Sequence, residues 1–171
     1  MTSPPLDAGG LLRRLYEAGV EYVVIGGLAV IAHGGRRLTN DLDICPAPDL
    51  PNLERLARML ERTDARQLGL GDFDEREFPF DPRRPEELAE GGNFRLLTTE
   101  GILDVMQWIS GISDEQAYRA LAADAVEGTA FGIPLKVCSL EQLRRMKRAA
   151  GRPQDQQDLA DLAAAHPEAK E

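Results

Sequence analysis

The chain has 171 residues, enough for one domain with a hydrophobic core, and its hydrophobic content of 43% excludes an intrinsically disordered protein. Acidic residues outnumber basic ones by 29 to 20, and the formal charge of −9 argues against a broad nucleic-acid-binding surface. No apolar run reaches the roughly 18 residues of a membrane-spanning helix, and residues 1–10 lack the pattern of a signal peptide. We therefore expect a cytoplasmic protein with no membrane contact and a single domain over residues 1–171, with its core at about residues 11–163.

The first half of the chain predicts alternating helices and strands. Apolar residues recur at helical spacing from Leu11 to Ala18, and Gly19 ends this helix. The β-branched and aromatic run at 21–25 is typical of a buried strand. Acidic and apolar residues alternate at 41–45, which predicts a strand with its carboxylates on one face. In chain order, we expect a helix at 11–18, a strand at 21–25, a short helix at 28–32, a strand at 41–45 and a helix at 50–62.

The second half predicts a hairpin followed by further strands and helices. Two strands at 94–98 and 102–108 are joined by a short polar turn, which is typical of a β-hairpin. Ser139 caps a helix that Gly151 ends, and Pro153 opens the last helix. After the hairpin, we expect a helix at 113–121 capped by Ser113, a strand or turn at 125–128, a strand at 132–137, a helix at 140–150 and a helix from 153 onward.

The order of these elements predicts an α/β (α+β) fold, in which a mixed β-sheet is flanked by helices and two helices form the C-terminal part. The order of the strands within the sheet cannot be read from the pattern, and residues 64–92 carry no interpretable signal. Cys45 and Cys138 have no cysteine or histidine nearby at zinc-ligand spacing, so we expect two buried free thiols.

Three aspartates stand in strands that are otherwise apolar. Asp41 and Asp43 are separated by one residue, so both side chains project from the same face of their strand. Carboxylates this close repel each other unless a cation lies between them, and Mg²⁺ prefers such oxygen ligands. Asp104 is a lone acid in an apolar strand, where an unpaired carboxylate is costly. The pattern favours a site for Mg²⁺ or Mn²⁺ at Asp41, Asp43 and Asp104; a solvated strand face for the pair and an ion pair for Asp104 are the alternatives.

A glycine turn precedes these carboxylates in the chain. Gly26 and Gly27 follow the strand at 21–25, and glycines allow a phosphate to approach the backbone closely. The glycine turn, residues 37–44 (RLTNDLDI) and residues 103–105 (LDV) together resemble the nucleotidyltransferase superfamily. The superfamily often has Gly-Ser at this turn. The second glycine therefore leaves the phosphate contact of the serine hydroxyl to backbone N–H groups, or removes it.

The C-terminal part narrows the resemblance. Residues 139–147 (SLEQLRRMK) and 151–159 (GRPQDQQDL) are similar to the lysine, Arg-Pro-x-Asp and Asp-Leu segment of the AbiEii toxin-like, or minimal, nucleotidyltransferases. The resemblance covers about residues 11–45 and 94–163. It implies an NTP donor, two divalent ions and a catalytic, metal-binding role for the three aspartates at 41, 43 and 104.

Six residues are candidates for contact with the nucleotide: Gly26, Gly27, Arg37, Thr39, Lys147 and Arg152. Lys147 could reach the donor phosphates as a point charge. Each candidate outside the glycine turn also has a structural alternative; for example, Arg152 could pair with Asp155 or Asp158 and hold the last two helices together. The aspartates Asp155, Asp158 and Asp161 recur every three residues, which indicates a solvated helix face.

Trp108 is expected in the core, although its closeness to Asp104 would also allow it to line a pocket for a base or an acceptor. The leading functional hypothesis is a metal-dependent transfer of a nucleoside monophosphate from an NTP to an unknown acceptor, RNA such as tRNA or a protein. The resemblance implies a toxin-like role with a cognate antitoxin as partner. The alternatives are adenylylation of a small antibiotic and a non-catalytic module that binds a nucleotide or a partner.

Overall fold

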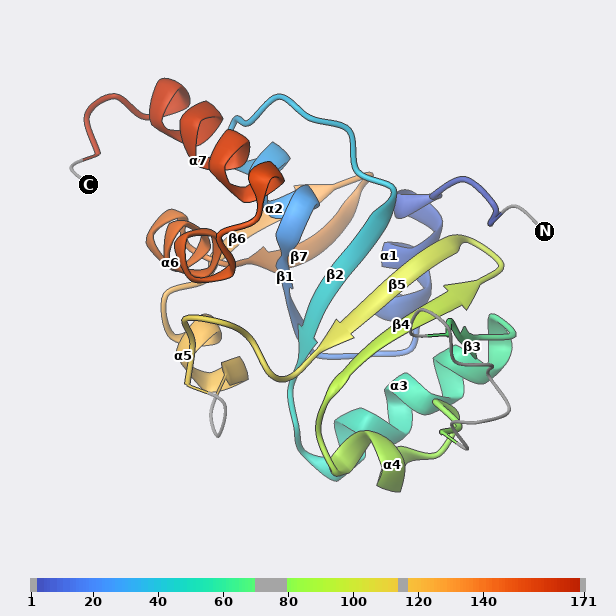
Figure 1. The fold of residues 1–171 in the computed structure, drawn as a ribbon. Helices are drawn as coiled ribbons and strands as arrows, with labels where there is room; N and C mark the ends of the chain where they lie inside the picture. Colours follow the sequence, from blue (N-terminus) through green and yellow to red (C-terminus); the bar gives the residue numbers. More distant parts are fainter. Residues whose placement is uncertain (1–2, 70–79, 114–116, 170–171) are drawn as a thin grey trace.

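The computed structural model describes residues 3–69, 80–113 and 117–169, whose strands form one mixed sheet (Figure 1). The strands are β1 (Tyr22–Ile25), β2 (Asp41–Pro46), β3 (Arg66–Gln67), β4 (Asn93–Thr98), β5 (Gly101–Met106), β6 (Val126–Ala130) and β7 (Ile133–Val137). Their spatial order is β3-β4-β5-β2-β1-β7-β6. β2 is parallel to β5 and β1 is parallel to β7, whereas the other neighbours are antiparallel. The expected mixed sheet is thus confirmed, and its centre consists of β5, β2 and β1.

Helices flank this sheet in two groups. They are α1 (Ala8–Glu17), α2 (Gly26–Ala32), α3 (Leu50–Arg62), α4 (Pro85–Ala89), α5 (Ala117–Ala123), α6 (Leu140–Ala150) and α7 (Pro153–Ala165). α1 packs across β7, β2 and β5, and α3 packs against α1 and α4. The two C-terminal helices lie side by side, and α6 also contacts α2 (Figure 1). The sheet centre therefore faces α2, α6 and α7 across the region that contains Asp41 and Asp43 of β2 and Asp104 of β5.

Local signals determine where the best-predicted helices begin and end. The Asp49 side chain accepts a hydrogen bond of 3.0 Å from the backbone N–H of Asn52 and caps α3. The Ser139 hydroxyl accepts one of 3.2 Å from the N–H of Gln142 and caps α6. Gly151 ends α6 with a φ of 63°, a left-handed conformation in which glycine has no side-chain clash. Both helices begin and end at their predicted residues, because capping chemistry acts within one turn.

The core consists of fully buried apolar side chains from both helices and strands. The largest are Leu11, Leu12, Leu15, Leu42, Ile44, Leu53, Leu56, Met59, Leu60, Leu88, Leu96 and Leu103. Leu42 and Leu103 alternate along their strands with Asp43 and Asp104, so the strand period directs aliphatic side chains to the core and the acids to the opposite face. Burial of each such side chain contributes about 1.5–3 kcal/mol, and this layer supports the strands that carry the acids.

Several expectations are corrected by the structure. The segment without signal contains β3 and α4, while residues 70–79 of that segment lie outside the described part. β5 ends at Met106, and Trp108 is 57% exposed, so its assignment to the core was wrong. The ambiguous run at 125–128 is part of the strand β6. α5 is described from Ala117, and residues 114–116, where the capped start of that helix was expected, also lie outside the described part.

Two further expectations concern buried thiols and membrane spans. Cys45 and Cys138 are both buried and free, as their spacing predicted. None of the helices in residues 3–69, 80–113 and 117–169 is long and apolar enough to cross a membrane.

Candidate active site

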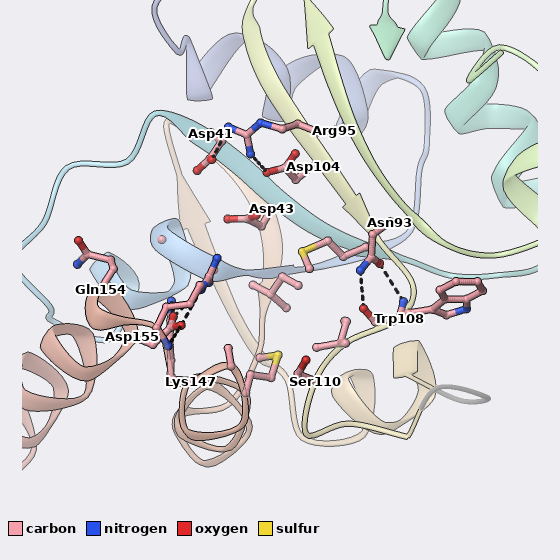
Figure 2. A pocket seen from close by; sticks show the side chains of 18 of the residues that line it. Asp41, Asp43, Asn93, Arg95, Asp104, Trp108, Ser110, Lys147, Gln154 and Asp155 are labelled. Atoms are coloured by element: carbon pink, nitrogen blue, oxygen red, sulfur yellow. Dashed lines mark hydrogen bonds and ion pairs between the residues drawn. The ribbon is translucent and has the colours of Figure 1, made fainter. Parts of the chain in front are cut away.

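Strand pairing brings the three candidate carboxylates to one face of the sheet. β2 runs parallel to β5 in a register that places Asp43 directly opposite Asp104. Asp41 lies two residues before Asp43 and therefore shares its face. On the other side of β2, Asp43 is opposite Ile25, the last residue of β1, so Gly26 follows at the same level. Figure 2 shows the three carboxylates next to each other on neighbouring strands.

An arginine that the sequence reasoning missed lies among these carboxylates. Arg95 on β4 is directly opposite Asp104 on β5. Its Nη1 donates to Asp104 Oδ2 at 2.6 Å, and its Nη2 donates to Asp41 Oδ2 at 3.2 Å (Figure 2). The structure pairs Thr98 with Gly101 across a two-residue turn, one residue shorter than the turn expected at 99–101, and this register makes Arg95 the partner of Asp104. The ion pair considered as an alternative for Asp104 is thus present.

Burial and mutual repulsion change the acidity of two carboxylates. Desolvation, with the charge of Asp41 as a second cause, raises the pKa of Asp43 to about 6, although a hydrogen bond from the backbone N–H of Gly27 opposes the shift. Desolvation and the charge of Asp43 raise the pKa of Asp104 to about 7, against the opposing effect of Arg95. Two acids with pKa values raised in this way are held close together despite their repulsion, as expected for groups that share a cation when it is bound.

The donor chemistry of these residues fits a divalent cation. Asp104 is 8% exposed, and its Oδ1 is buried without a hydrogen-bond partner, so this oxygen is an unsatisfied acceptor that a bound cation would satisfy. Carboxylate oxygens are the protein ligands that Mg²⁺ and Mn²⁺ prefer. In the arrangement observed, with the Arg95 guanidinium bound to Asp41 and Asp104, no group of three or more His, Cys, Asp or Glu side chains within the described ranges is placed to hold a metal ion.

The glycine turn lies against the carboxylates. Gly26 has a φ of +65°, and a Cβ at this position would clash with the Asp43 carboxylate. A Cβ on Gly27 would lie 2.6 Å from the Thr39 hydroxyl oxygen, so Thr39 fills the space that a larger residue at position 27 would need. The Thr39 hydroxyl donates to the backbone oxygen of Asp41 at 2.9 Å and lies 3.2 Å from the Asp41 carboxylate. Thr39 therefore supports both the turn and the start of β2.

The candidate cations of the C-terminal part form a buried network. Lys147 is 6% exposed, and its Nζ lies 2.9 Å from Asp155 Oδ1 and 2.8 Å from Asp158 Oδ2. Arg152 pairs with Asp155 at 2.8 Å, and Arg37 pairs with Asp158 at 2.8 Å. Both aspartates are fully buried, so the prediction of a solvated face was wrong for them. The helical period alone did not reveal that three cations converge on this side of α7.

In this network the pKa values of the carboxylates are lowered, whereas those of Asp43 and Asp104 on the sheet are raised. Burial on its own raises the pKa of Asp155, but hydrogen bonds from Arg152 and Lys147 outweigh it and hold the pKa at about 2. The pKa of Asp158 is lowered in the same way, because hydrogen bonds from Lys147 and Gln154 outweigh burial. Arg152 thus pairs with Asp155 at the helix junction, the structural alternative that was open for it.

A pocket of about 510 Å³ joins all these elements. Five of the six nucleotide-binding candidates line it, together with the three carboxylates; Thr39 lies behind Gly27 instead. Another part of the wall consists of residues that the sequence did not single out for a site, with the exception of Trp108: Asn93, Met106, Trp108, Ile109, Ser110 and Met146. Asn93 fixes the start of this wall, because its amide donates to the backbone oxygen of Trp108 at 2.7 Å and accepts from the Trp108 N–H at 3.1 Å (Figure 2).

No protein-family model and no curated protein sequence is significantly similar to the chain. Among solved structures, the chain is similar to a Thermotoga maritima protein that is described provisionally as a nucleotidyltransferase. The two share 17% sequence identity with a TM-score of 0.54, and the match covers 91% of this chain and 92% of the other. The sheet of seven strands and its flanking helices in the described residues therefore have a nucleotidyltransferase-like fold. At this identity the likeness concerns the fold, and the carboxylate pocket is the basis for function.

Proposed function

We propose that the chain is a metal-dependent nucleotidyltransferase that moves a nucleoside monophosphate from an NTP to an acceptor. The observation that carries this proposal is the convergence of Asp41, Asp43 and Asp104 in one pocket beside the Gly26-Gly27 turn. The similarity in fold to a protein described as a nucleotidyltransferase supports the same reaction class. The carboxylates lie on paired strands of the sheet centre, so the scaffold holds them in place without ligand.

The roles of the residues follow from their positions. Asp41, Asp43 and Asp104 would hold Mg²⁺ or Mn²⁺, with the unpaired Oδ1 of Asp104 as a free ligand. Such an ion supplies charge neutralisation at the phosphates and a lower pKa for the attacking hydroxyl. At the glycine turn the phosphates would approach the backbone, since the two glycines let it lie against Asp43 and Thr39 without side chains of their own. Arg37, Lys147 and Arg152 would place positive charge on the phosphate side of the pocket.

The acceptor would enter from the side of Trp108 and Ser110. This wall combines an exposed aromatic ring with the apolar Met106 and Met146 side chains, a surface suited to a flat group. Residues 144–152 contain five basic residues that would suit a tRNA end, but they do not form one continuous surface, because Arg144 and Lys147 are buried. We propose RNA or a protein as acceptor class, in the manner of the AbiEii-like toxins with a cognate antitoxin, and a small antibiotic as the alternative acceptor.

The proposal is tested by incubating the protein with each α-labelled NTP and Mg²⁺ or Mn²⁺ against tRNA, whole-cell protein and aminoglycosides. We expect label transfer to one acceptor class, and loss of transfer by at least about a hundredfold in Asp43→Asn, which removes one ligand of the ion. Asp161→Asn is the matched control, because Asp161 lies on α7 outside the pocket and contacts Gln157. A parent protein that binds an NTP by calorimetry but labels nothing would instead indicate a nucleotide-binding module.

A further inference from the structure

Arg95 is the only residue in the described pocket whose charged group bridges two of the three candidate metal ligands. Its position is built into the sheet, since β4 and β5 pair Arg95 directly with Asp104. The guanidinium lies 2.6 Å from one oxygen of Asp104 and 3.2 Å from one oxygen of Asp41. Two of the three carboxylates that would hold a divalent cation are thus each paired with Arg95 through one oxygen (Figure 2).

A guanidinium and a divalent cation compete for the same carboxylates. An oxygen that accepts a hydrogen bond from Arg95 keeps a second lone pair, but a divalent cation bound beside it would lie close to the guanidinium, and the two positive charges would repel. Asp104 uses one of its two oxygens for the ion pair. Its Oδ2 accepts a hydrogen bond from Arg95, whereas its Oδ1 is buried without a hydrogen-bond partner. While Arg95 stays in place, Asp41 and Asp104 are therefore paired with its guanidinium, and the three carboxylates are not arranged to hold a metal ion.

Two of the cations that line the pocket, Lys147 and Arg95, differ in their freedom to move. The Lys147 side chain is 7% exposed and is enclosed between two buried aspartates. The Arg95 side chain is 44% exposed, and both of its contacts are made by the terminal guanidinium. Arg95 can therefore swing into solvent by side-chain rotation alone, whereas Lys147 cannot leave without disturbing the junction of α6 and α7.

We propose that Arg95 is the resident counter-cation of the carboxylate cluster, and that a divalent cation binds there only by displacing its guanidinium. The proposal rests on the proposed function, because it concerns the same metal site. It assigns Arg95 a positioning role, as a residue that keeps Asp41 and Asp104 oriented and neutralised until an ion arrives. Arg95 consequently lowers the affinity for the metal and stabilises the metal-free protein.

The first test is calorimetric titration of the metal-free protein with Mn²⁺. We expect Arg95→Gln to bind Mn²⁺ more tightly than the parent, by about tenfold, and to melt at a lower temperature without metal. Arg14→Gln is the matched control. Arg14 pairs with Glu100 at 3.0 Å, with side-chain exposures of 47% and 12%, close to the 44% and 11% of Arg95 and Asp104. The control should change neither the affinity nor the shift in melting temperature on addition of Mn²⁺.

The second test follows the guanidinium directly. The ¹⁵Nε signal of Arg95, assigned by its loss in Arg95→Gln, should move towards that of a solvated arginine when diamagnetic Mg²⁺ saturates the site. The proposal is overturned by an unchanged signal at saturation, by equal or weaker Mn²⁺ binding in Arg95→Gln, or by an equal gain in Arg14→Gln. In those cases the metal site and the proposed function stand. Absence of Mn²⁺ binding in both the parent and Arg95→Gln would overturn the metal-dependent function as well.

Discussion

At the scale of single residues, the space beside the carboxylates is controlled by two glycines and one threonine. Gly26 needs its positive φ and has the Asp43 carboxylate where a Cβ would be, and Gly27 has Thr39 in that place. The hydroxyl of Thr39 therefore lies close to where the side chain of a serine at position 27 would project. Thr39 nevertheless lies behind Gly27 and does not line the pocket, so its contact with a nucleotide stays a prediction.

Gly27→Val tests the turn. The valine Cβ would lie 2.6 Å from the Thr39 hydroxyl oxygen and 3.5 Å from Arg37 Cζ, so the valine side chain would displace these neighbours of the turn. We expect NTP affinity in the presence of Mg²⁺ to fall by about tenfold or more, measured by calorimetry, with an unchanged circular dichroism spectrum. Gly128→Val on β6 is the control, because no atom lies within 4 Å of a Cβ there. Normal NTP binding in Gly27→Val would remove the turn from the nucleotide site.

At the scale of elements, the junction of α6 and α7 acts as one wall of the pocket. Gly151 reverses the chain in a left-handed conformation, Arg152 forms a capping box with Asp155, and Pro153 starts α7. Lys147 then joins the two helices, because its ammonium group contacts an acid from each of two successive turns of α7. The wall is therefore stiff, and its cations are held at fixed positions around Asp155 and Asp158.

Lys147→Met tests the stiffness of this wall. It keeps the length and apolar character of the side chain but leaves two buried carboxylates without their shared cation, a change that costs about 3 kcal/mol or more. We expect a loss of this order in the free energy of unfolding, measured by urea denaturation. Lys136→Met on the exposed face of β7 should change it little. A stable Lys147→Met protein that has lost NTP affinity would instead place Lys147 in contact with the nucleotide.

At the scale of the whole molecule, two groups of buried acids respond to pH in opposite directions. Asp43 and Asp104, with pKa values of about 6 and about 7, hold protons more tightly in the folded state than in the unfolded state. Between about pH 4 and pH 7, the folded protein therefore binds more protons, and its stability falls as the pH rises. Asp155, with a pKa of about 2, contributes stability above the unfolded value of 3.8, which is lost as the pH falls below it.

The metal-free protein should accordingly be less stable at about pH 7.5 than at about pH 4.5. Urea denaturation in the presence of a chelator measures this difference. In Asp104→Asn the decline should be smaller, because one raised pKa is removed. Millimolar Mg²⁺ should raise the stability of the parent at the higher pH more than that of Asp104→Asn. A stability that rises steadily from about pH 4.5 to about pH 7.5 would show that the cluster does not hold its protons in this way.

The sequence by itself determined the features that depend on near neighbours in the chain. The helices at 50–62 and 140–150 were predicted at their observed ends because caps and apolar periods act within a few residues. The two aspartates of β2 were placed on one face because side chains alternate along a strand. The hairpin itself was predicted, but its register was not, because the expected turn at 99–101 is one residue longer than the observed turn between Thr98 and Gly101.

Only the tertiary structure decided which distant segments meet. The parallel pairing of β2 with β5 sets Asp43 opposite Asp104, and no local pattern specifies a neighbour some sixty positions away. The same reason explains the burial of Asp155 and Asp158, because Arg37 comes from the loop before β2 and Lys147 from α6. Trp108 is exposed because β5 ends before it, where its ring borders a pocket rather than the core. Burial and sheet order depend on the packing of the whole chain, which residue spacing does not encode.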